Sequence, residues 1–215
     1  PNVSVETLKE QYTDSNSQFI SVDGLEVHYK DEGSGFPIVL LHGTSASLHT
    51  WDAWTEELIK NYRVIRMDLP AFGITGPNAT NQYDLETYNR FLEAFLNQLE
   101  VDNFVLAGNS LGGSIGWHYA SDHQEQVQQL ILLDPAGFPS EKERPLIFRL
   151  AEIPVVNQLL KHITPRSFVK DNLKEVYFDD NKISEALIDR YHQMILREGN
   201  RTAFIERANL EGQDD

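Results

Sequence analysis

Hydrophobic and polar positions follow two different rhythms along the first two thirds of the chain. Short, continuous apolar runs are typical of strands buried on both faces of a parallel sheet, and they occur at 38–41, 64–67, 104–107 and 130–133. Between them, apolar residues recur every three to four positions, which predicts helices over 51–60, 85–99 and 111–121. Because strands that alternate with helices form right-handed crossovers, we predict an α/β protein with a mostly parallel sheet flanked by helices.

The stretch before the first buried run has a different pattern. Asp23-Gly24 lies between two β-rich runs at 19–22 and 25–29, and an Asp-Gly pair in that setting is typical of a β-hairpin. We expect this hairpin to add antiparallel strands at one edge of the sheet. The residues before it, 1–17, are polar and are expected to lie on the surface.

The alternation of strands and helices ends near Pro139. From 141 to 208 the pattern is helical, most clearly over 184–197, and no buried strand is predicted. We therefore predict a core over 1–138, a helical cap inserted over 139–208, and a loop over 209–215. The apolar residues of 146–156 are expected to line a pocket between cap and core.

Charge and composition narrow the choice of partners and compartment. Asp and Glu total 33 against 18 Lys and Arg, a net charge of −15, which repels phosphate backbones, so no nucleic-acid partner is expected. No cysteine is present, which excludes disulfides and thiolate chemistry, and no apolar run has transmembrane length. A cytoplasmic location is slightly favoured, but the chain begins at Pro1 rather than Met, which leaves a removed leader or anchor open.

The residues after the run 104–107 carry the predicted chemistry. Gly108-Asn109-Ser110-Leu111-Gly112 fits the G-x-S-x-G nucleophile elbow, in which a serine sits on a sharp turn between a strand and a helix. The alternatives are an ordinary glycine-rich turn and a phosphate-binding loop. The flanking strand and helix disfavour the first, and the lack of a lysine after Gly113 disfavours the second. We therefore predict that Ser110 is the nucleophile.

A second motif, Leu41-His42-Gly43-Thr44, follows an earlier buried run. Acyl transfer needs N–H donors where the oxyanion of the tetrahedral intermediate forms, and the backbone amides of Thr44 and Leu111 are the predicted donors. His42 precedes Ser110, whereas in chains with this nucleophile elbow the catalytic triad follows the order serine, acid, histidine. We therefore expect His42 to hydrogen-bond to backbone rather than to act as the base.

Together these motifs resemble the α/β-hydrolase superfamily, in the capped bacterial branch that includes esterases and carbon–carbon bond hydrolases. The resemblance rests on the segments 42–47, 68–73, 108–113 and 133–137 and on Trp51. One departure is Ala71, where these proteins usually carry glycine. The resemblance implies two further strands after the cap, missing from this chain, which would deliver the catalytic acid and base beyond residue 215. The chain is therefore expected to be truncated, with an incomplete sheet edge open to pairing with another chain.

Other candidate residues have plainer interpretations. Asp134 ends the run 130–133, where some superfamily members place the acid, but a role in capping the turn into Pro135 is preferred. His118, Asp122 and His123 have a helical spacing that a metal accepts, but a surface helix end explains them better. We therefore expect no metal and no cofactor.

The sequence thus predicts a serine hydrolase that cleaves an ester or related acyl bond of a small, fairly apolar molecule through a Ser110 acyl-enzyme. Two alternatives stay open: a carbon–carbon bond hydrolase on the same fold, and a non-catalytic binding protein, since a fold does not fix a function. The 215-residue piece alone is expected to be inactive, because a serine without a base is a poor nucleophile at neutral pH.

Overall fold

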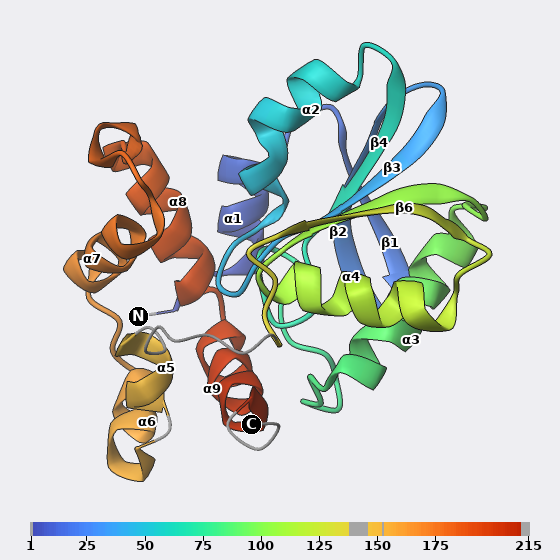
Figure 1. The fold of residues 1–215 in the computed structure, drawn as a ribbon. Helices are drawn as coiled ribbons and strands as arrows, with labels where there is room; N and C mark the ends of the chain where they lie inside the picture. The colour runs from blue at the N-terminus through green and yellow to red at the C-terminus, as the bar shows by residue number, and fades with distance from the viewer. Residues whose placement is uncertain (1, 138–145, 152, 212–215) are drawn as a thin grey trace.

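A computed structural model describes residues 2–137, 146–151 and 153–211 and places one sheet at their centre (Figure 1). The sheet has the strand order β1-β2-β4-β3-β5-β6 among these residues. Strands β3 to β6 are parallel, while β1 and β2 form an antiparallel hairpin at one edge. The predicted hairpin and mostly parallel sheet are therefore confirmed. The strands are β1 (Ser17–Val22), β2 (Leu25–Gly33), β3 (Phe36–Leu41), β4 (Tyr62–Met67), β5 (Phe104–Asn109) and β6 (Val127–Leu133).

Helices cover both faces of this sheet. Side chains of successive strand residues point to opposite faces, so Val39 and Leu41 pack into a core with helices α3 (Leu85–Gln98) and α4 (Leu111–Asp122). Ile38 and Leu40 pack on the other face beneath Trp51, which ends the 3₁₀-helix η1 (Leu48–Trp51) before α2 (Asp52–Leu58). The central strands are therefore buried on both sides, as their continuous apolar runs predict.

Strand β6 differs from this prediction. Its apolar run predicts burial on both faces, yet Leu130 and Ile131 are each 37% exposed. A strand side chain is buried only where a layer covers its face, and β6 is the edge strand of the part of the sheet that the structure describes. Strand β6 therefore carries more apolar side chains than its described neighbours bury.

Residues 2–17 lie largely on the surface, as expected, but they also form a helix that the sequence did not predict. Ser4 caps helix α1 (Val5–Tyr12), and its side chain accepts a hydrogen bond from the Thr7 amide. Leu8 is fully buried and clusters with Ile74 and Met194. One apolar face of α1 therefore packs onto the body of the molecule.

The N-terminal residues also pair with a distant part of the chain. Val3 donates its amide to the Leu196 carbonyl at 2.8 Å, and the Glu198 amide donates to the Val3 carbonyl at 3.2 Å. Leu196 ends helix α8 (Glu185–Leu196). The first residues of the chain thus bind directly to one of the last described helices.

We expect Leu8→Ala to lower the free energy of unfolding by about 2–5 kcal/mol, because it leaves a cavity between α1 and Met194. Urea denaturation of the protein measures this loss. The matched control is Glu10→Ala, an exposed position of the same helix, which should change stability by less than about 0.5 kcal/mol. Equal losses for the two variants would contradict the burial of Leu8.

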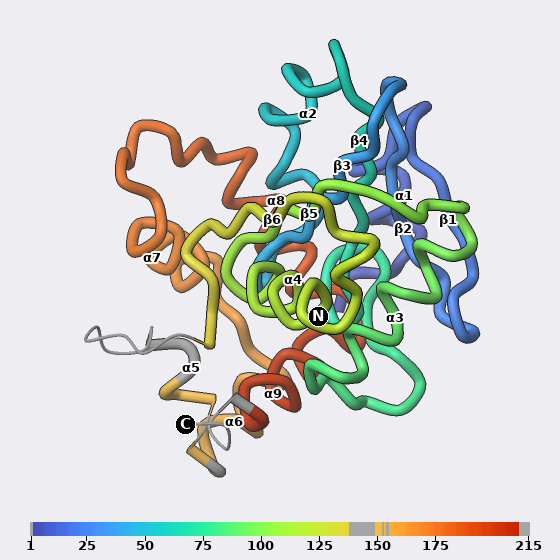
Figure 2. The backbone as a smooth tube through the Cα atoms, turned by 45° about the vertical axis from the view of Figure 1, so that its right-hand side comes forward, coloured from blue at the N-terminus to red at the C-terminus, as the bar shows by residue number. Residues whose placement is uncertain are grey.

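Residues 146–211, here named the helical segment, contain no strand where they are described. Figures 1 and 2 show α5, α6 and α7 to one side of the sheet, with α9 beneath it. The predicted boundary at 138/139 lies outside the described residues, and α9 continues past the predicted cap end at 208. None of the described helices is long and apolar enough to cross a bilayer. The remaining helices are α5 (Leu146–Ala151), α6 (Pro154–Leu160), α7 (Arg166–Val176), the 3₁₀-helix η2 (Asp180–Lys182) and α9 (Asn200–Glu211).

Candidate active site

Ser110 occupies the sharp turn between β5 and α4. Its backbone has φ 50° and ψ −116°, a conformation that costs a non-glycine residue on the order of 1–3 kcal/mol. Hydrogen bonds hold the turn on both sides: the Ser110 amide donates to the Leu133 carbonyl at 3.0 Å, and the Ala136 amide donates to the Ser110 carbonyl at 3.1 Å. The strained turn is therefore fixed by the end of β6.

Two glycines make this turn sterically feasible. A Cβ atom at Gly108 would lie 2.1 Å from the Gly112 carbonyl oxygen, and one at Gly112 would lie 2.2 Å from the Leu41 carbonyl oxygen. Both distances are far shorter than any real van der Waals contact, so α4 approaches β5 and β3 this closely only with glycine at both positions. This explains physically why the motif requires its flanking glycines.

The loop after β3 lies directly against Ser110. A Cβ atom at Gly43 would lie 3.2 Å from the Ser110 Cβ, and the next residue, Thr44, lines the same cavity as Ser110. Leu111 begins α4 with its side chain buried. The amides of Thr44 and Leu111 donate to no acceptor among the described residues, so both N–H groups are available at this end of the sheet.

His42 has a structural environment. It is fully buried, and its Nε2 accepts a hydrogen bond from the Leu69 amide at 2.9 Å. Its Nδ1 therefore carries the proton and donates to the Gly43 carbonyl at 2.7 Å. Burial lowers the pKa of His42, although Asp68 and the Gly43 carbonyl oppose that effect. The neutral ring fixes the shape of the Gly43 loop, as expected from the sequence.

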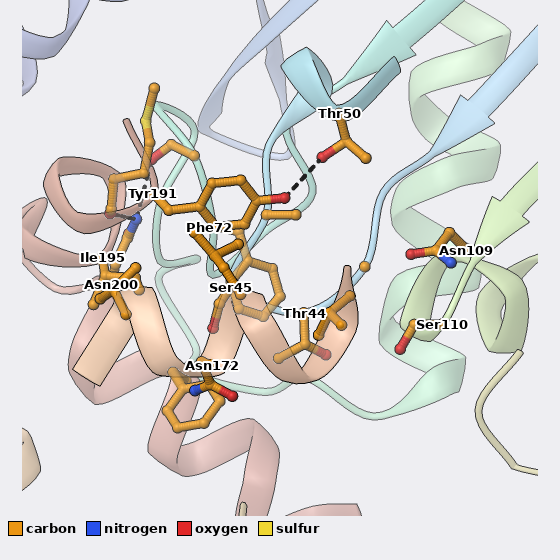
Figure 3. Close-up of a pocket in the computed structure, with 18 of the residues that line it drawn as sticks. Thr44, Ser45, Thr50, Phe72, Asn109, Ser110, Asn172, Tyr191, Ile195 and Asn200 are labelled. Atoms are coloured by element: carbon orange, nitrogen blue, oxygen red, sulfur yellow. Dashed lines mark hydrogen bonds between the residues drawn. The ribbon is translucent and has the colours of Figure 1, made fainter. Parts of the chain in front are cut away.

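Ser110 opens into a cavity of about 530 Å³ between the sheet and the helical segment (Figure 3). Asn109 and Ser110 lie on one side of it, and Ile195 and Asn200 lie on the other. The Asn109 side-chain amide donates to the Leu133 carbonyl at 3.0 Å and so is fixed beside Ser110. Most of the wall is apolar and includes Trp51, Trp54, Phe72, Phe168, Leu173 and Phe204.

The cavity wall differs from the one predicted over 146–156. Leu150, Ile153, Val155 and Val156 do not line it, and the side chains of 146–148 lie outside the described part. Helices α7, α8 and α9 form this wall instead. All these stretches are apolar, and sequence alone does not say which of several neighbouring helices faces the core.

The helical segment also supplies polar groups that sequence reasoning missed. The Tyr191 hydroxyl lies 3.4 Å from Thr50 Oγ1, and burial raises the pKa of Tyr191. Asn200 Nδ2 donates to the carbonyls of Gly73 and Met194, which leaves its buried Oδ1 without a partner among the described residues. Arg201 lines the cavity and is 8% exposed, and its guanidinium donates to the His162 carbonyl and to Asn2 Oδ1. Of these groups, the Asn200 Oδ1 is open to a hydrogen bond from the part of a ligand that lies away from Ser110.

Asp68 holds the loop after β4, whose residues Phe72 and Gly73 line the cavity. The carboxylate is fully buried and accepts hydrogen bonds from the amides of Leu48 at 2.7 Å and Ile74 at 2.8 Å. Burial alone would raise the pKa of Asp68, but His28 and the neighbouring histidines hold it well below its usual range. Ala71, at the position where glycine was expected, has φ 83°. The Asp68 hydrogen bonds hold this loop despite the left-handed strain at Ala71.

The remaining candidates do not reach Ser110. Its Oγ makes no capping hydrogen bond to α4, and no hydrogen bond joins it to these side chains among the described residues. Asp134 is exposed with φ 42°, and the rings of His118 and His123 lie against Trp117 and Tyr119. No group of three metal-ligating side chains occurs among the described residues. None of these candidate side chains therefore forms a hydrogen bond with Ser110 among the described residues.

Comparisons with known proteins agree with this geometry. Residues 37–157 match the family model of the alpha/beta hydrolase fold. The chain is 28% identical to a 2-hydroxymuconate semialdehyde hydrolase of Pseudomonas sp. strain CF600 over 187 residues, covering 84% of the chain and 62% of that protein. The chain thus spans about six tenths of the length of the curated relatives it matches.

Two solved structures place the fold among hydrolases. The Cif epoxide hydrolase from Acinetobacter nosocomialis superposes with a TM-score of 0.82 at 17% identity, over 98% of this chain and 71% of that one. A serine hydrolase involved in carbazole degradation, CarC, gives a TM-score of 0.72 at 26% identity, over 89% and 67%. The first likeness concerns the fold alone, while the second extends to sequence.

Proposed function

Because the chain belongs to the α/β-hydrolase fold family, we propose that it hydrolyses an ester or related acyl bond of a small, fairly apolar molecule, with Ser110 as the nucleophile. The observation that carries this proposal is the position of Ser110. It sits at φ 50° on a turn that opens into an apolar cavity of about 530 Å³. A serine held in that conformation presents its hydroxyl to a bound carbonyl group.

In the proposed mechanism, Ser110 Oγ attacks the carbonyl carbon and its proton passes to a histidine base. The amides of Thr44 and Leu111 stabilise the oxyanion, and each such donor contributes about 3–4 kcal/mol in comparable enzymes. The base then protonates the leaving group, and water hydrolyses the acyl-enzyme. We propose that the acid and the base lie beyond residue 215, because Ser110 Oγ has no hydrogen bond to a described histidine. Asp134 stays a second choice for the acid. This mechanism uses no cofactor.

We propose that the helical segment acts as a cap over Ser110. Most of the α7, α8 and α9 side chains that line the cavity are apolar. The polar exceptions are Asn172, Tyr191, Asn200 and Arg201. An apolar substrate body would lie along this wall, and a polar end would reach the Asn200 Oδ1 or the Arg201 guanidinium. Excluding water in this way strengthens every hydrogen bond at the reacting carbonyl.

A second candidate is hydrolysis of a carbon–carbon bond next to a ketone, because a matched relative is named a 2-hydroxymuconate semialdehyde hydrolase. The two reactions share the attack of Ser110 on a carbonyl and differ in the leaving group, which is an alkoxide in one and a carbanion in the other. Only the second needs a group that delivers a proton to carbon.

Assays of the full-length protein separate these candidates. We expect kcat/KM for p-nitrophenyl butyrate to exceed that for a 2-hydroxy-6-oxodienoic acid by at least about tenfold, a difference of 1.4 kcal/mol in transition-state binding. The reverse order would assign the carbon–carbon reaction. A fluorophosphonate adduct that maps to Ser110 reports whether Ser110 is activated. Tight binding of an ester analogue with neither turnover nor an adduct would instead indicate a binding protein.

We also propose that the 215-residue piece pairs with other chains through β6. This strand is the edge of the described sheet and carries the exposed side chains of Leu130 and Ile131. An unpaired apolar strand is a template for a strand from another molecule.

A further inference from the structure

A second chain of hydrogen bonds of the serine–histidine–carboxylate kind lies outside the cavity. Ser17 Oγ is 3.0 Å from His28 Nε2, and His28 Nδ1 is 2.9 Å from Asp68 Oδ2. Ser17 begins β1, His28 lies in β2, and Asp68 directly follows β4, so three adjacent strands bring the groups together (Figure 1). None of the three lines the cavity of Ser110.

The hydrogen positions follow from the surrounding donors. Asp68 is an anion that already accepts two backbone amides, so the proton between it and His28 belongs to His28 Nδ1. In the neutral ring, the Nε2 lone pair then faces Ser17. The Asp14 amide donates to Ser17 Oγ at 3.2 Å, which leaves the Ser17 hydrogen to point at Nε2. Nucleophile, base and orienting carboxylate therefore stand in the relation that activates a serine.

Exposure differs between the two ends of this chain of hydrogen bonds. His28 and Asp68 are fully buried, whereas Ser17 is half-buried at the start of its strand. The side chain of Asp14, whose amide donates to Ser17, is paired with Lys30 at 2.6 Å. Ser17 is thus the accessible end of this chain of hydrogen bonds, while the base behind it is shielded from water.

We propose that Ser17 is a second reactive serine, a site of covalent modification by small, uncharged acyl or phosphonyl donors. With a fluorophosphonate, the Oγ–P bond forms as the P–F bond breaks, and fluoride leaves with the electron pair. The Ser17 proton passes to His28 Nε2, and the resulting imidazolium is held by the buried Asp68 carboxylate. Among the described residues, the backbone amide that donates to Ser17 Oγ is that of Asp14, and a donor to the nucleophile itself does not stabilise an oxyanion. We therefore expect Ser17 to react about 100 to 1,000 times more slowly than Ser110 and to be modified without turnover.

The experiment uses full-length Ser110→Ala protein, in which the cavity serine cannot react. After treatment with a fluorophosphonate, peptide mass spectrometry gives the labelling rate of each serine. We expect Ser17 to react about 100-fold or more faster than Ser21, an exposed serine of the same strand, because general-base assistance contributes at least that factor. The adduct should disappear in Ser110→Ala/Ser17→Ala and persist in Ser110→Ala/Ser21→Ala.

A further variant tests the base itself. His28→Gln in the Ser110→Ala background should slow labelling of Ser17 by about 100-fold, and circular dichroism checks that the variant is folded. Labelling of Ser17 no faster than that of Ser21, or an unchanged rate in folded His28→Gln protein, would overturn the proposal. Labelling of Ser110 in the wild-type protein is measured separately. A failure of the Ser17 proposal therefore leaves the proposal for Ser110 intact, and the reverse also holds.

Discussion

Ser110→Ala is expected to lower kcat for ester hydrolysis by the full-length protein by about a millionfold. The alanine keeps the backbone turn but removes the only oxygen that forms the acyl-enzyme. The cavity and the amides of Thr44 and Leu111 remain, so KM should change by less than about tenfold. Single-turnover kinetics with p-nitrophenyl butyrate measure the loss, and mass spectrometry confirms the identity of each variant.

The matched control is Ser114→Ala, a buried serine about one turn after Ser110, inside α4. This serine is placed in no catalytic step, and its substitution should leave kcat within about threefold of the wild-type value. If Ser110→Ala retains more than about a tenth of the activity while Ser114→Ala loses it, the assignment of the nucleophile is wrong. Thermal unfolding of both variants shows whether either loss reflects the fold.

Asp68→Asn is expected to lower the free energy of unfolding by about 3–5 kcal/mol, because it leaves buried groups without their charged partner. The carboxylate accepts from two amides and from His28, whereas an asparagine side chain offers a single acceptor oxygen. Urea denaturation measures the loss. Glu26→Gln is the control, since its ion pair with Lys9 is exposed and is expected to contribute less than about 1 kcal/mol.

Acid is expected to lower the free energy of unfolding of the wild-type protein, because it protonates Asp68. The pKa of Asp68 in the folded state is lowered, whereas the unfolded carboxyl titrates near about 3.9. Its contribution to stability is therefore present above about pH 4 and is lost as the pH falls further toward the folded pKa. Unfolding free energies between about pH 6 and pH 3 should fall more steeply for the wild-type protein than for Asp68→Asn; parallel curves would contradict this role.

The sheet and the turn at Ser110 were predictable because their signals are local. Apolar runs such as 38–41 specify buried strands by composition, and Asp23-Gly24 specifies a hairpin by backbone geometry. The elbow likewise depends on residues adjacent in sequence, with Gly108 and Gly112 providing the close approach of helix and strand. Features of this kind need no knowledge of distant contacts.

The features that were missed depend on contacts between distant residues. Helix α1 has a single apolar stripe over Val5, Leu8 and Tyr12, and its burial depends on Met194 in α8. The roles of Tyr191 and Asn200 depend on which face of the helical segment meets the sheet. The predicted burial of β6 is too high for the same reason. An apolar run indicates that a strand is suited to burial, but it does not identify the elements that cover the strand.

The pairing of the two ends of the described chain has a consequence for synthesis on the ribosome. Asn2 accepts a hydrogen bond from Arg201, 199 positions later, and Leu8 is buried against Met194. At translation rates of about 5–20 residues per second, the first residues wait roughly 10–40 s for these partners to be made. During that interval the apolar face of α1 is exposed on the nascent chain, where it is open to a chaperone that binds short apolar segments.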